Sequence, residues 1–455
     1  MAGATLKSSE ILRGAHGAAT CLVRSGALAA RPIAAVTNAA ATLCVLSRAA
    51  AAIGAPLFPL DPALPAATVE ELIGQTGANL VVGERMVPGC HFVPEAALFE
   101  TPSASSPPPS RLRAGDIALL VATSGLTGQP KAVMLTARAL RAAAEASASL
   151  TPLGAADIWL ACLPLFHIGG HSILVRCGLA GADVVLHQGF DAERLGRALV
   201  AEAVTHLSLV PAMLAQLLDV LAFPPPALRH VLVGGAALPA ALAERAAGQG
   251  WPIQPTYGMS ETASQLATLA RLPRPWPQGL VGRPLPGAEA ALTDEGRVKA
   301  RGPMLMAGYA NPTLSPGDGL EEGWFVTNDL AEITPDGDLV ILGRADDVII
   351  SGGKKILPAM VEALLCPCPG LDAVAIAGRP DAVWGEIVTA VYAGKIPPQA
   401  VLDWCRAAVP GPLRPRAAVR VEALPLLASG KPDRAALRRI AAQIHRDVPQ
   451  TPDGC

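Results

Sequence analysis

The sequence has few aromatic residues and no excess of basic charge. Phe, Trp and Tyr make up 4% of its 455 residues, and the formal net charge is −2. A nucleic-acid partner requires a basic surface, so we expect none. Rings for stacking are scarce, and each Tyr or Trp inside a motif is therefore informative.

Long apolar runs are also missing. The Ala-rich N-terminus is interrupted by Lys7, Arg13, Arg24, Arg31 and Arg48 before any run reaches about 18 residues, so we expect no membrane span. No clean apolar segment follows the first positive charge, which argues against a cleavable signal.

The chain also lacks a regular cysteine pattern. Nine Cys are scattered along it, an odd number that favours reduced thiols in a cytoplasmic protein over a disulfide framework. Cys366 and Cys368 form the only close pair. They have no second pair and no nearby His at zinc spacing, so we do not expect a metal site there.

What is present is a long, apolar chain with alternating patterns. The hydrophobic fraction of 51% excludes disorder, and 455 residues imply at least two domains. From residue 117, strands are expected at 117–122, 132–135, 158–162, 183–187, 206–210, 230–233 and 253–256. Between them we expect helices that begin after Thr136, over 168–179 and 192–202, at Pro211, and over 239–247. This alternation predicts an α/β fold with stacked, mostly parallel sheets flanked by helices. After about residue 285, turns separate short strands, which predicts a small β-rich section and then a small α+β domain from about residue 346.

The strongest motif is Thr123-Ser-Gly-Leu-Thr-Gly-Gln-Pro-Lys131. Its glycines let backbone N–H groups turn toward an anion, and its hydroxyls and lysine add donors and positive charge. The candidate phosphate-binding residues are Thr123, Ser124, Gly125, Thr127, Gly128 and Lys131. The spacing is not that of a Walker loop, and an ordinary flexible turn is the alternative.

A second motif, Tyr257-Gly-Met-Ser-Glu-Thr262, directly follows an expected strand, where α/β sheets bind ligands. The aromatic face suits a purine, and the Glu261 carboxylate suits Mg²⁺ beside phosphates. Upstream, Gly235 and Ala236 follow another strand and leave room for a flat base. Each of the two segments could equally be a tight turn.

Three further segments are shorter. Asp329 ends Gly323-Trp-Phe-Val-Thr-Asn-Asp329, and Arg344 lies in Gly343-Arg-Ala-Asp-Asp347; they could bind ribose or phosphate, or be solvated turn residues. Gly352 and Gly353 form another glycine-rich turn. Lys431 lies in Ser429-Gly-Lys431 near the C-terminus, where a lone Lys is usually a surface charge.

In this order and spacing, the segments resemble those of the acyl-adenylate-forming superfamily of acyl-CoA synthetases, adenylation domains and luciferases, over about residues 50–440. The resemblance implies an ATP- and Mg²⁺-dependent ligase that couples a small-molecule carboxylic acid to coenzyme A through an acyl-adenylate. It also implies a large domain over residues 1–344, a hinge at 345–347 and a small mobile domain over 348–455. A homo-oligomer is possible, and the part before the first motif is expected to lack one helix and one hairpin of the family's large domain.

The resemblance also implies roles for individual residues. Ser260 matches the α-phosphate position, Glu261 the Mg²⁺ ligand and Tyr257 the residue against the adenine face, with Gly258 beside it. Asp329 and Arg344 match ribose-binding positions, and Asp346 matches the hinge. Lys431 matches the lysine that acts in adenylation, and Gly352 and Gly353 match the pantetheine path.

Leu163-Pro-Leu-Phe-His-Ile168 and Tyr257–Ser264 are similar to the subfamily of ligases that act on o-succinylbenzoate in menaquinone synthesis. His167 matches a gate of the acid pocket. Arg176 lies nine residues further on in an apolar stretch, and a buried Arg needs an anion. Either it holds a second carboxylate of the substrate, or it forms a structural ion pair or reaches solvent.

Other functions remain open at this point. The acid could be another aryl or medium-chain acid, or the acceptor could be the thiol of a carrier protein. Leu126 stands where the family usually has Ser or Thr, and this departure raises a non-catalytic paralogue as a third alternative. The presence of Glu261 and Lys431 argues against that alternative.

Overall fold

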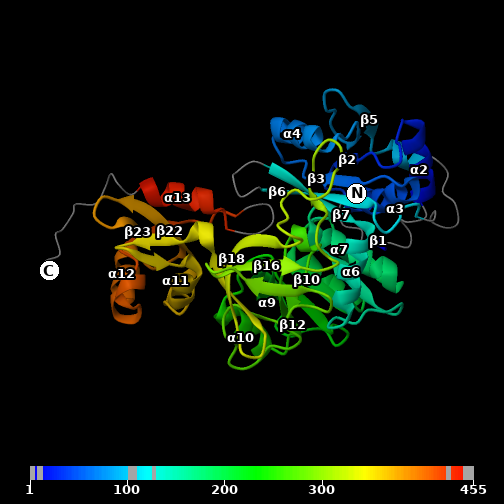
Figure 1. Cartoon of the computed structure of the whole chain (residues 1–455). Coiled ribbons are helices and arrows are strands. Elements are labelled where there is room, and N and C mark those ends of the chain that lie inside the picture. Colours follow the sequence, from blue (N-terminus) through cyan, green and yellow to red (C-terminus); the bar gives the residue numbers. More distant parts are fainter. Residues whose placement is uncertain (1–5, 8–13, 101–109, 125–129, 427–431, 444–455) are drawn as a thin grey trace.

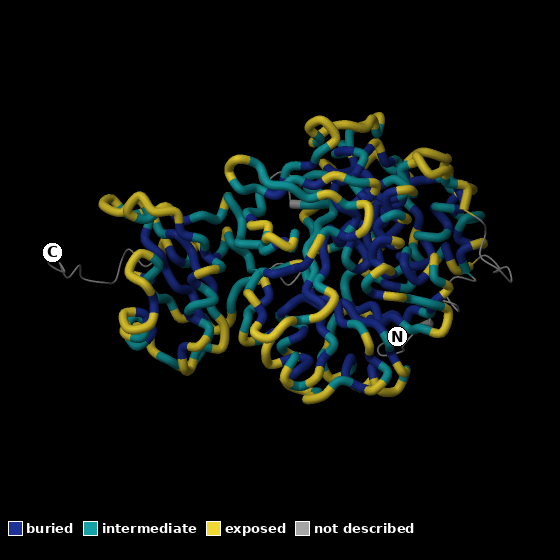
Figure 2. Tube along the Cα trace, turned by 60° about the horizontal axis from the view of Figure 1, so that its bottom comes forward, coloured by how far each residue is buried: buried dark blue, intermediate teal, exposed yellow. Residues whose placement is uncertain are grey.

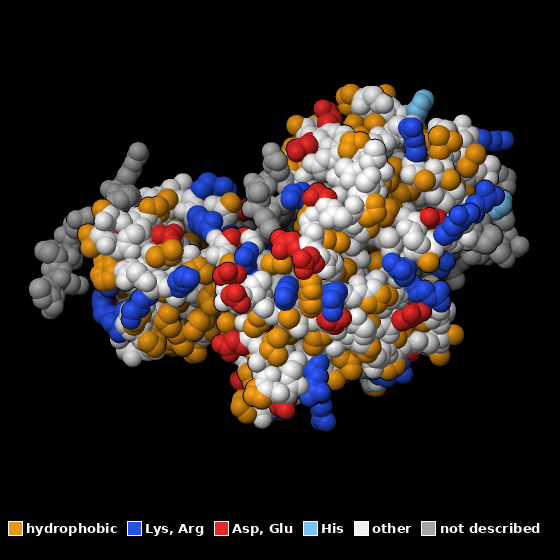
Figure 3. All heavy atoms as spheres, viewed as in Figure 1, with side chains coloured by type: hydrophobic (Ala, Val, Ile, Leu, Met, Phe, Trp, Pro, Cys, Tyr) orange, Lys and Arg blue, Asp and Glu red, His pale blue; other side chains and the backbone are white. Residues whose placement is uncertain are grey.

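The computed structural model describes residues 6–7, 14–100, 110–124, 130–426 and 432–443. They form a large domain and a small C-terminal domain that lie side by side with a narrower waist between them (Figures 1 and 3). The large domain holds two seven-stranded sheets and one five-stranded sheet, and the small domain holds a fourth sheet. Acidic and basic side chains are interspersed over much of the face in Figure 3. The predicted fold class is confirmed.

The first sheet is parallel except at its edges. In spatial order its strands are β1 (Leu6–Lys7), β9 (Asp183–Leu186), β8 (Ile158–Ala161), β10 (His206–Leu209), β11 (His230–Val233), β12 (Ile253–Tyr257) and β13 (Ala267–Thr268). Only β1 and β13 run antiparallel to their neighbours. The five inner strands therefore end at one edge, where the segments after β11 and β12 come together.

The second sheet carries the hairpin of the first motif. Its strands are, in spatial order, β17 (Gly308–Tyr309), β7 (Pro130–Thr136), β6 (Ile117–Ser124), β3 (Leu57–Leu60), β2 (Ile33–Val36), β4 (Leu80–Gly83) and β5 (His91–Pro94). Strand β17 comes from far along the sequence and pairs antiparallel with β7.

Helices cover both sheets in layers. Between the two sheets lie α2 (Ala15–Arg24), α3 (Ala40–Ile53), α6 (Ala137–Ala148) and α7 (Ile168–Ala180), in the largest apolar core. The outer face of the first sheet packs on α8 (Ala192–Ala201), α9 (Pro211–Val220) and α10 (Ala240–Gly248). The outer face of the second packs on α4 (Ala66–Thr76), and the short α5 (Ala97–Glu100) contacts α2. Figure 2 shows the buried residues following these layers.

The predicted β-rich section is an antiparallel sheet. Its strands are β14 (Leu280–Gly282), β19 (Leu339–Arg344), β18 (Phe325–Ile333), β16 (Arg297–Arg301) and β15 (Glu289–Leu292). The pairing of β18 with β19 places Asp329 opposite Arg344. Two candidate ribose-binding residues thus become neighbours through strand register alone.

The small domain packs helices on a mostly antiparallel sheet. Its strands are β21 (Lys354–Ile356), β20 (Ile349–Ser351), β23 (Gly385–Gly394), β22 (Leu371–Asp381) and β24 (Ala417–Val421), and its helices are α11 (Pro358–Leu365), α12 (Pro398–Ala408) and α13 (Arg434–Gln443). The 3-10 turn η2 (Ala345–Asp347) joins β19 to β20. The domain boundaries at 344 and 348 stay a prediction.

Local signals explain why the expected elements form. The Thr136 hydroxyl accepts a hydrogen bond from the Ala139 N–H at 3.0 Å and caps α6. Pro211 opens α9, where its missing N–H costs nothing. Gly181 ends α7 in the left-handed region. The elements expected between 117 and 256 agree with the structure to within about two residues, whereas the pattern before residue 117 predicted no elements. Among the described residues, no helix is both long and apolar enough to cross a bilayer.

Candidate active site

The hairpin of β6 and β7 brings both ends of the phosphate-loop motif together. Thr123 lies opposite Lys131 in the strand register, and its hydroxyl donates to the Lys131 carbonyl at 3.4 Å. Ser124 is the last residue of β6, and its backbone pairs with Pro130. Gly125, Leu126, Thr127 and Gly128 lie outside the described residues. Their predicted phosphate contacts stay a prediction.

Tyr309 joins the hairpin to the Glu261 segment. Strand β17 places Tyr309 opposite Val133 of β7, and its hydroxyl donates to Glu261 Oε1 at 2.9 Å. Lys131 Nζ lies 4.6 Å from the centre of the Tyr309 ring, on its face. Burial, together with the negative charge of Glu261, raises the pKa of Tyr309 well above its usual range, so the phenol keeps its proton.

The sequence interpretation missed Tyr309. The one signal that could have found it was its rarity, because the chain contains only three Tyr. Its contacts place a cation over the face of one ring and a carboxylate at the hydroxyl of the same ring, a combination that suits Mg²⁺ and phosphates.

A second ring holds a second carboxylate. Tyr257 ends β12, and its hydroxyl donates to Asp329 Oδ2 at 2.7 Å. Burial and the charge of Asp329 raise the pKa of Tyr257 well above its usual value. Arg344 Nη1 lies 3.5 Å from Asp329 Oδ1. Three residues predicted to bind the nucleoside are therefore in one chain of contacts.

Backbone geometry explains two glycines at this edge. A Cβ on Gly258 would lie 1.7 Å from the carbonyl oxygen of Ser264, so no other residue fits there. Gly235 has φ +78°, in the region that favours glycine. Gly235 and Ala236 follow β11, and Tyr257 ends the neighbouring parallel strand β12. The residues predicted to bind the flat adenine base thus lie at the ends of the adjacent strands β11 and β12.

Helix α7 carries both predicted acid-pocket residues. His167 is the N-cap of α7, with its ring centre 4.8 Å from that of Phe166. Arg176 is 5% exposed, and its Nη2 donates to Ser264 Oγ at 3.2 Å. The guanidinium also lies 5.4 Å from the Trp159 ring centre. Burial lowers the pKa of Arg176 to about 10. Among the described residues, no carboxylate forms an ion pair with it.

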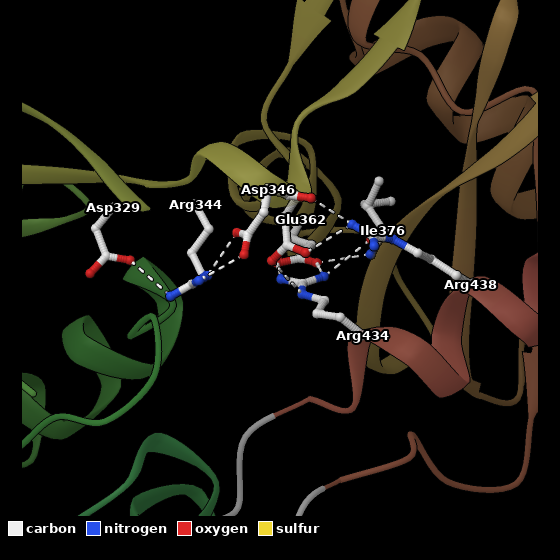
Figure 4. Close-up of polar contacts among 8 residues, drawn as sticks. Asp329, Arg344, Asp346, Glu362, Ile376, Arg434 and Arg438 are labelled. Carbon is white, nitrogen blue, oxygen red and sulfur yellow. Dashed lines mark hydrogen bonds and ion pairs between the residues drawn. The ribbon is translucent and has the colours of Figure 1, made fainter. Parts of the chain in front are cut away.

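Ion pairs surround the predicted hinge (Figure 4). Arg344 donates two hydrogen bonds to the Asp346 carboxylate, at 2.8 and 2.7 Å. Arg438 of α13 donates to the Asp346 carbonyl at 2.8 Å and to Asp347 Oδ1 at 3.2 Å. Burial raises the pKa of Asp346, but the hydrogen bonds and charge of Arg344 outweigh it and leave that pKa lowered.

Arg434 ties the start of α13 to the same region. Its Nη1 lies 2.7 Å from Glu362 Oε1 of α11, and its Nε lies 3.5 Å from Asp347 Oδ2. Lys431, three residues before α13, lies outside the described residues. The start of α13, which follows Lys431 in the sequence, is therefore anchored next to η2 through Arg434.

Gly352 and Gly353 form the tight turn between β20 and β21, both with positive φ. A Cβ on Gly352 would lie 2.8 Å from the Trp384 ring. A flat aromatic surface thus adjoins the predicted pantetheine path, and the glycine is required for this approach.

The residues present fit Mg-ATP. Among the described residues, no three His, Cys, Asp or Glu side chains gather to hold a metal by themselves. Mg²⁺ is commonly bound by one or two carboxylates together with substrate phosphates, and Glu261 offers one such carboxylate near Lys131. The Tyr257 ring and Asp329 offer a stacking face and an acceptor for ribose hydroxyls.

The chain belongs to the AMP-binding enzyme family. It matches the model of that family over residues 3–310 and the model of the AMP-binding enzyme C-terminal domain over residues 360–431. The predicted superfamily and enzyme class are thereby confirmed.

More particular similarities lie within the family. The chain is 36% identical to the 2-succinylbenzoate–CoA ligase of Bacillus licheniformis over 343 residues, 72% of each chain. It is similar to the o-succinylbenzoate CoA synthetase of Bacillus subtilis in complex with its acyl-adenylate intermediate (TM-score 0.84, 27% identity, 94% of this chain and 92% of that one). The same protein in complex with ATP and magnesium has a TM-score of 0.84 at 27% identity, with coverage of 94% and 93%.

Proposed function

We propose that the chain is an ATP-dependent carboxylic acid–CoA ligase for o-succinylbenzoate or a closely related acid. The observation that carries this proposal is the pair of ring–carboxylate contacts, Tyr257 with Asp329 and Tyr309 with Glu261, the second of which adjoins Lys131. The names of the similar ligases support the choice of acid.

In the proposed first half-reaction, a carboxylate oxygen of the acid attacks the α-phosphorus of ATP. A P–O bond forms, the bond to pyrophosphate breaks, and pyrophosphate leaves with the electron pair. Negative charge gathers on phosphoryl oxygens, so fixed cations and donors lower the barrier. Lys131, Ser124, Thr127 and Ser260 supply them, Lys431 bridges acid and phosphate, and bound Mg²⁺, held by Glu261, would neutralise phosphate charge.

In the second half-reaction, the thiol of coenzyme A loses its proton and attacks the acyl carbon, and AMP leaves. Gly352 and Gly353 would line the approach of the pantetheine arm, and rotation at Asp346 would bring them to the site. A cytoplasmic location and a homo-oligomer belong to the proposal as predictions from the sequence.

Arg176 is proposed to bind the second carboxylate of the acid. It is buried on α7 next to Ser264, three residues after Glu261, and a guanidinium pairs well with a carboxylate. His167, at the other end of α7, would gate the same pocket.

The test uses a matched pair of acids, o-succinylbenzoate and 4-oxo-4-phenylbutanoate, which differs only in lacking the second carboxylate. With ATP and CoA, wild type should favour the dicarboxylate in kcat/KM, and Arg176→Leu should lower that preference by at least about tenfold, since a charged hydrogen bond contributes roughly 1.5–3 kcal/mol. Wild type that already prefers the monoacid would instead indicate a general aryl- or acyl-CoA ligase. ATP–pyrophosphate exchange with no AMP release on addition of CoA would point to a carrier-protein acceptor.

A further inference from the structure

A cavity of about 220 Å³ lies between α6 and α7, apart from the residues assigned to ATP. Its lining is formed by Arg141, Ala144, Glu145, Ser147, Ala148, Thr151, Leu153, Trp159, Arg176, Leu179 and Ala180. The walls are alanine and leucine side chains, and the ion pair of Arg141 with Glu145 lies at the exposed mouth. The proposed reaction places the second carboxylate of the acid beside Arg176 and Ser264, and it assigns no ligand to the other residues that line this cavity.

Four polar atoms lining this cavity lack hydrogen-bond partners among the described residues. They are Arg176 Nε, Trp159 Nε1, Ser147 Oγ and Thr151 Oγ1. All four residues are at most 5% exposed. Buried polar atoms in folded proteins nearly always have a hydrogen-bond partner. Four such atoms without a partner around one cavity therefore indicate a binding site for a ligand.

The orphan atoms select an anion. The Arg176 and Trp159 N–H groups can only donate, and the two hydroxyls can donate as well. The guanidinium charge is offset within the described chain only by the Trp159 ring and by the neutral Ser264 hydroxyl. A buried cation without a counter-charge is unfavourable, and a bound anion removes that penalty. The lowered pKa of Arg176, caused by burial, agrees with this deficit.

Size and charge narrow the class of anion. The cavity is far larger than a halide, and its apolar walls suit a short hydrocarbon body. A dianion such as phosphate is disfavoured, because Arg176 is the single cation inside and the Arg141–Glu145 ion pair at the mouth adds no net charge. A monocarboxylate with a compact apolar body satisfies the donors and the walls together.

We propose that the cavity between α6 and α7 binds a small apolar monocarboxylate, with the carboxylate on Arg176 Nε, Trp159 Nε1 and the hydroxyls of Ser147 and Thr151. This site uses Arg176 Nε, whereas the contact with Ser264 uses Arg176 Nη2. Because the same guanidinium reaches Ser264, the ligand is linked mechanically to the Tyr257–Ser264 segment.

The test is calorimetric titration of the full-length protein with benzoate. The double variant Ser147→Ala/Thr151→Val leaves Arg176 in place and removes two donors, and it should weaken benzoate binding by at least about tenfold. Ser149→Ala is the matched control: its hydroxyl donates to the Ala146 carbonyl at 2.7 Å and lines no part of the cavity, so benzoate affinity should not change.

Two further measurements complete the test. In crystals with 4-bromobenzoate, the anomalous bromine signal should lie between α6 and α7. Without ligand, the double variant should unfold at the same temperature as wild type or slightly higher, because unpartnered buried hydroxyls add nothing to stability. Unchanged benzoate affinity in the double variant, bromine only beside Glu261, or a marked loss of stability in the double variant would each overturn the proposal.

Discussion

In the large domain both candidate active-site carboxylates accept hydrogen bonds from tyrosines, and Asp329 is also paired with Arg344, whereas around residues 345–347 the acidic groups are held by arginines. The Asp329 side chain is 18% exposed and accepts from Tyr257, while Arg344, Asp346 and Arg438 are 42%, 41% and 53% exposed. Hydrogen bonds from shielded rings fix a carboxylate in one position. Exposed ion pairs contribute little stability and exchange readily with water.

This difference suits the two half-reactions. Groups that stabilise phosphoryl charge must be fixed before the reaction begins, because their reorganisation would add to the barrier. Groups at a rotating joint must release one partner and take another. Four sets of measurements would sharpen or break this comparison.

The largest effect is expected for Lys431→Ala. Its charge is needed only where phosphoryl charge develops, so release of pyrophosphate should fall at least about 100-fold. Conversion of supplied acyl-adenylate to thioester should largely survive. Lys395→Ala, an exposed charge of the same domain, is the control and should change neither step. Equal losses in both steps would contradict the role given to Lys431.

Next are the two residues of the Tyr309–Glu261 contact. Glu261→Gln should lower kcat/KM for ATP by about 100-fold, and Tyr309→Phe by about tenfold, with more Mg²⁺ needed for half-maximal rate. Tyr392→Phe removes a hydroxyl that donates to the Ile396 carbonyl of the small domain at 2.7 Å, and it should leave ATP use unchanged. If Tyr309→Phe kept the Mg²⁺ dependence of wild type, the role given to the Tyr309 hydroxyl would be wrong.

A smaller effect, confined to the second half-reaction, is expected at the hinge. Asp346→Pro restricts φ, so thioester formation should drop by about tenfold while adenylation persists. Asp346→Ala removes the same ion pair with Arg344 but keeps backbone freedom, and it should lower thioester formation less than twofold. If the two variants behave alike, the ion pair matters rather than rotation.

The smallest effect concerns acid stability of the large domain. Burial lowers the pKa values of His171, His187 and His206 to about 4, whereas an unfolded His titrates near 6.5. The stability these neutral histidines contribute is complete above about pH 6.5 and is lost as the pH falls toward 4. The described residues of the small domain contain no His.

Amide hydrogen exchange at pH 7 and pH 5, corrected for the intrinsic rate, measures this difference. Protection in β8 and β10 should fall at pH 5, and protection in β22 and β23 should change less. Equal losses in both domains would show that buried histidines do not govern acid stability.

Much of the architecture was predictable because its signals are local. Thr136 as a cap, Pro211 at a first turn, and short apolar runs between turns placed most elements from 117 to 256 within about two residues. Before residue 117 the segments of β2 and α3 are rich in alanine, which suits a buried or an exposed face, so no period of two or 3.6 stands out.

The sequence by itself determined the family, the order of the motifs and the chemical types at the site, because glycines, hydroxyls and the Tyr257–Glu261 segment keep their spacing along the chain. Only the tertiary structure decided which of these groups meet. Tyr309 reaches Glu261 across 48 residues because β17 pairs with β7, and Asp329 meets Arg344 through the register of β18 and β19. Such pairings depend on how buried sheets and helices pack into layers, and that packing involves residues far apart in sequence, which a local pattern does not encode.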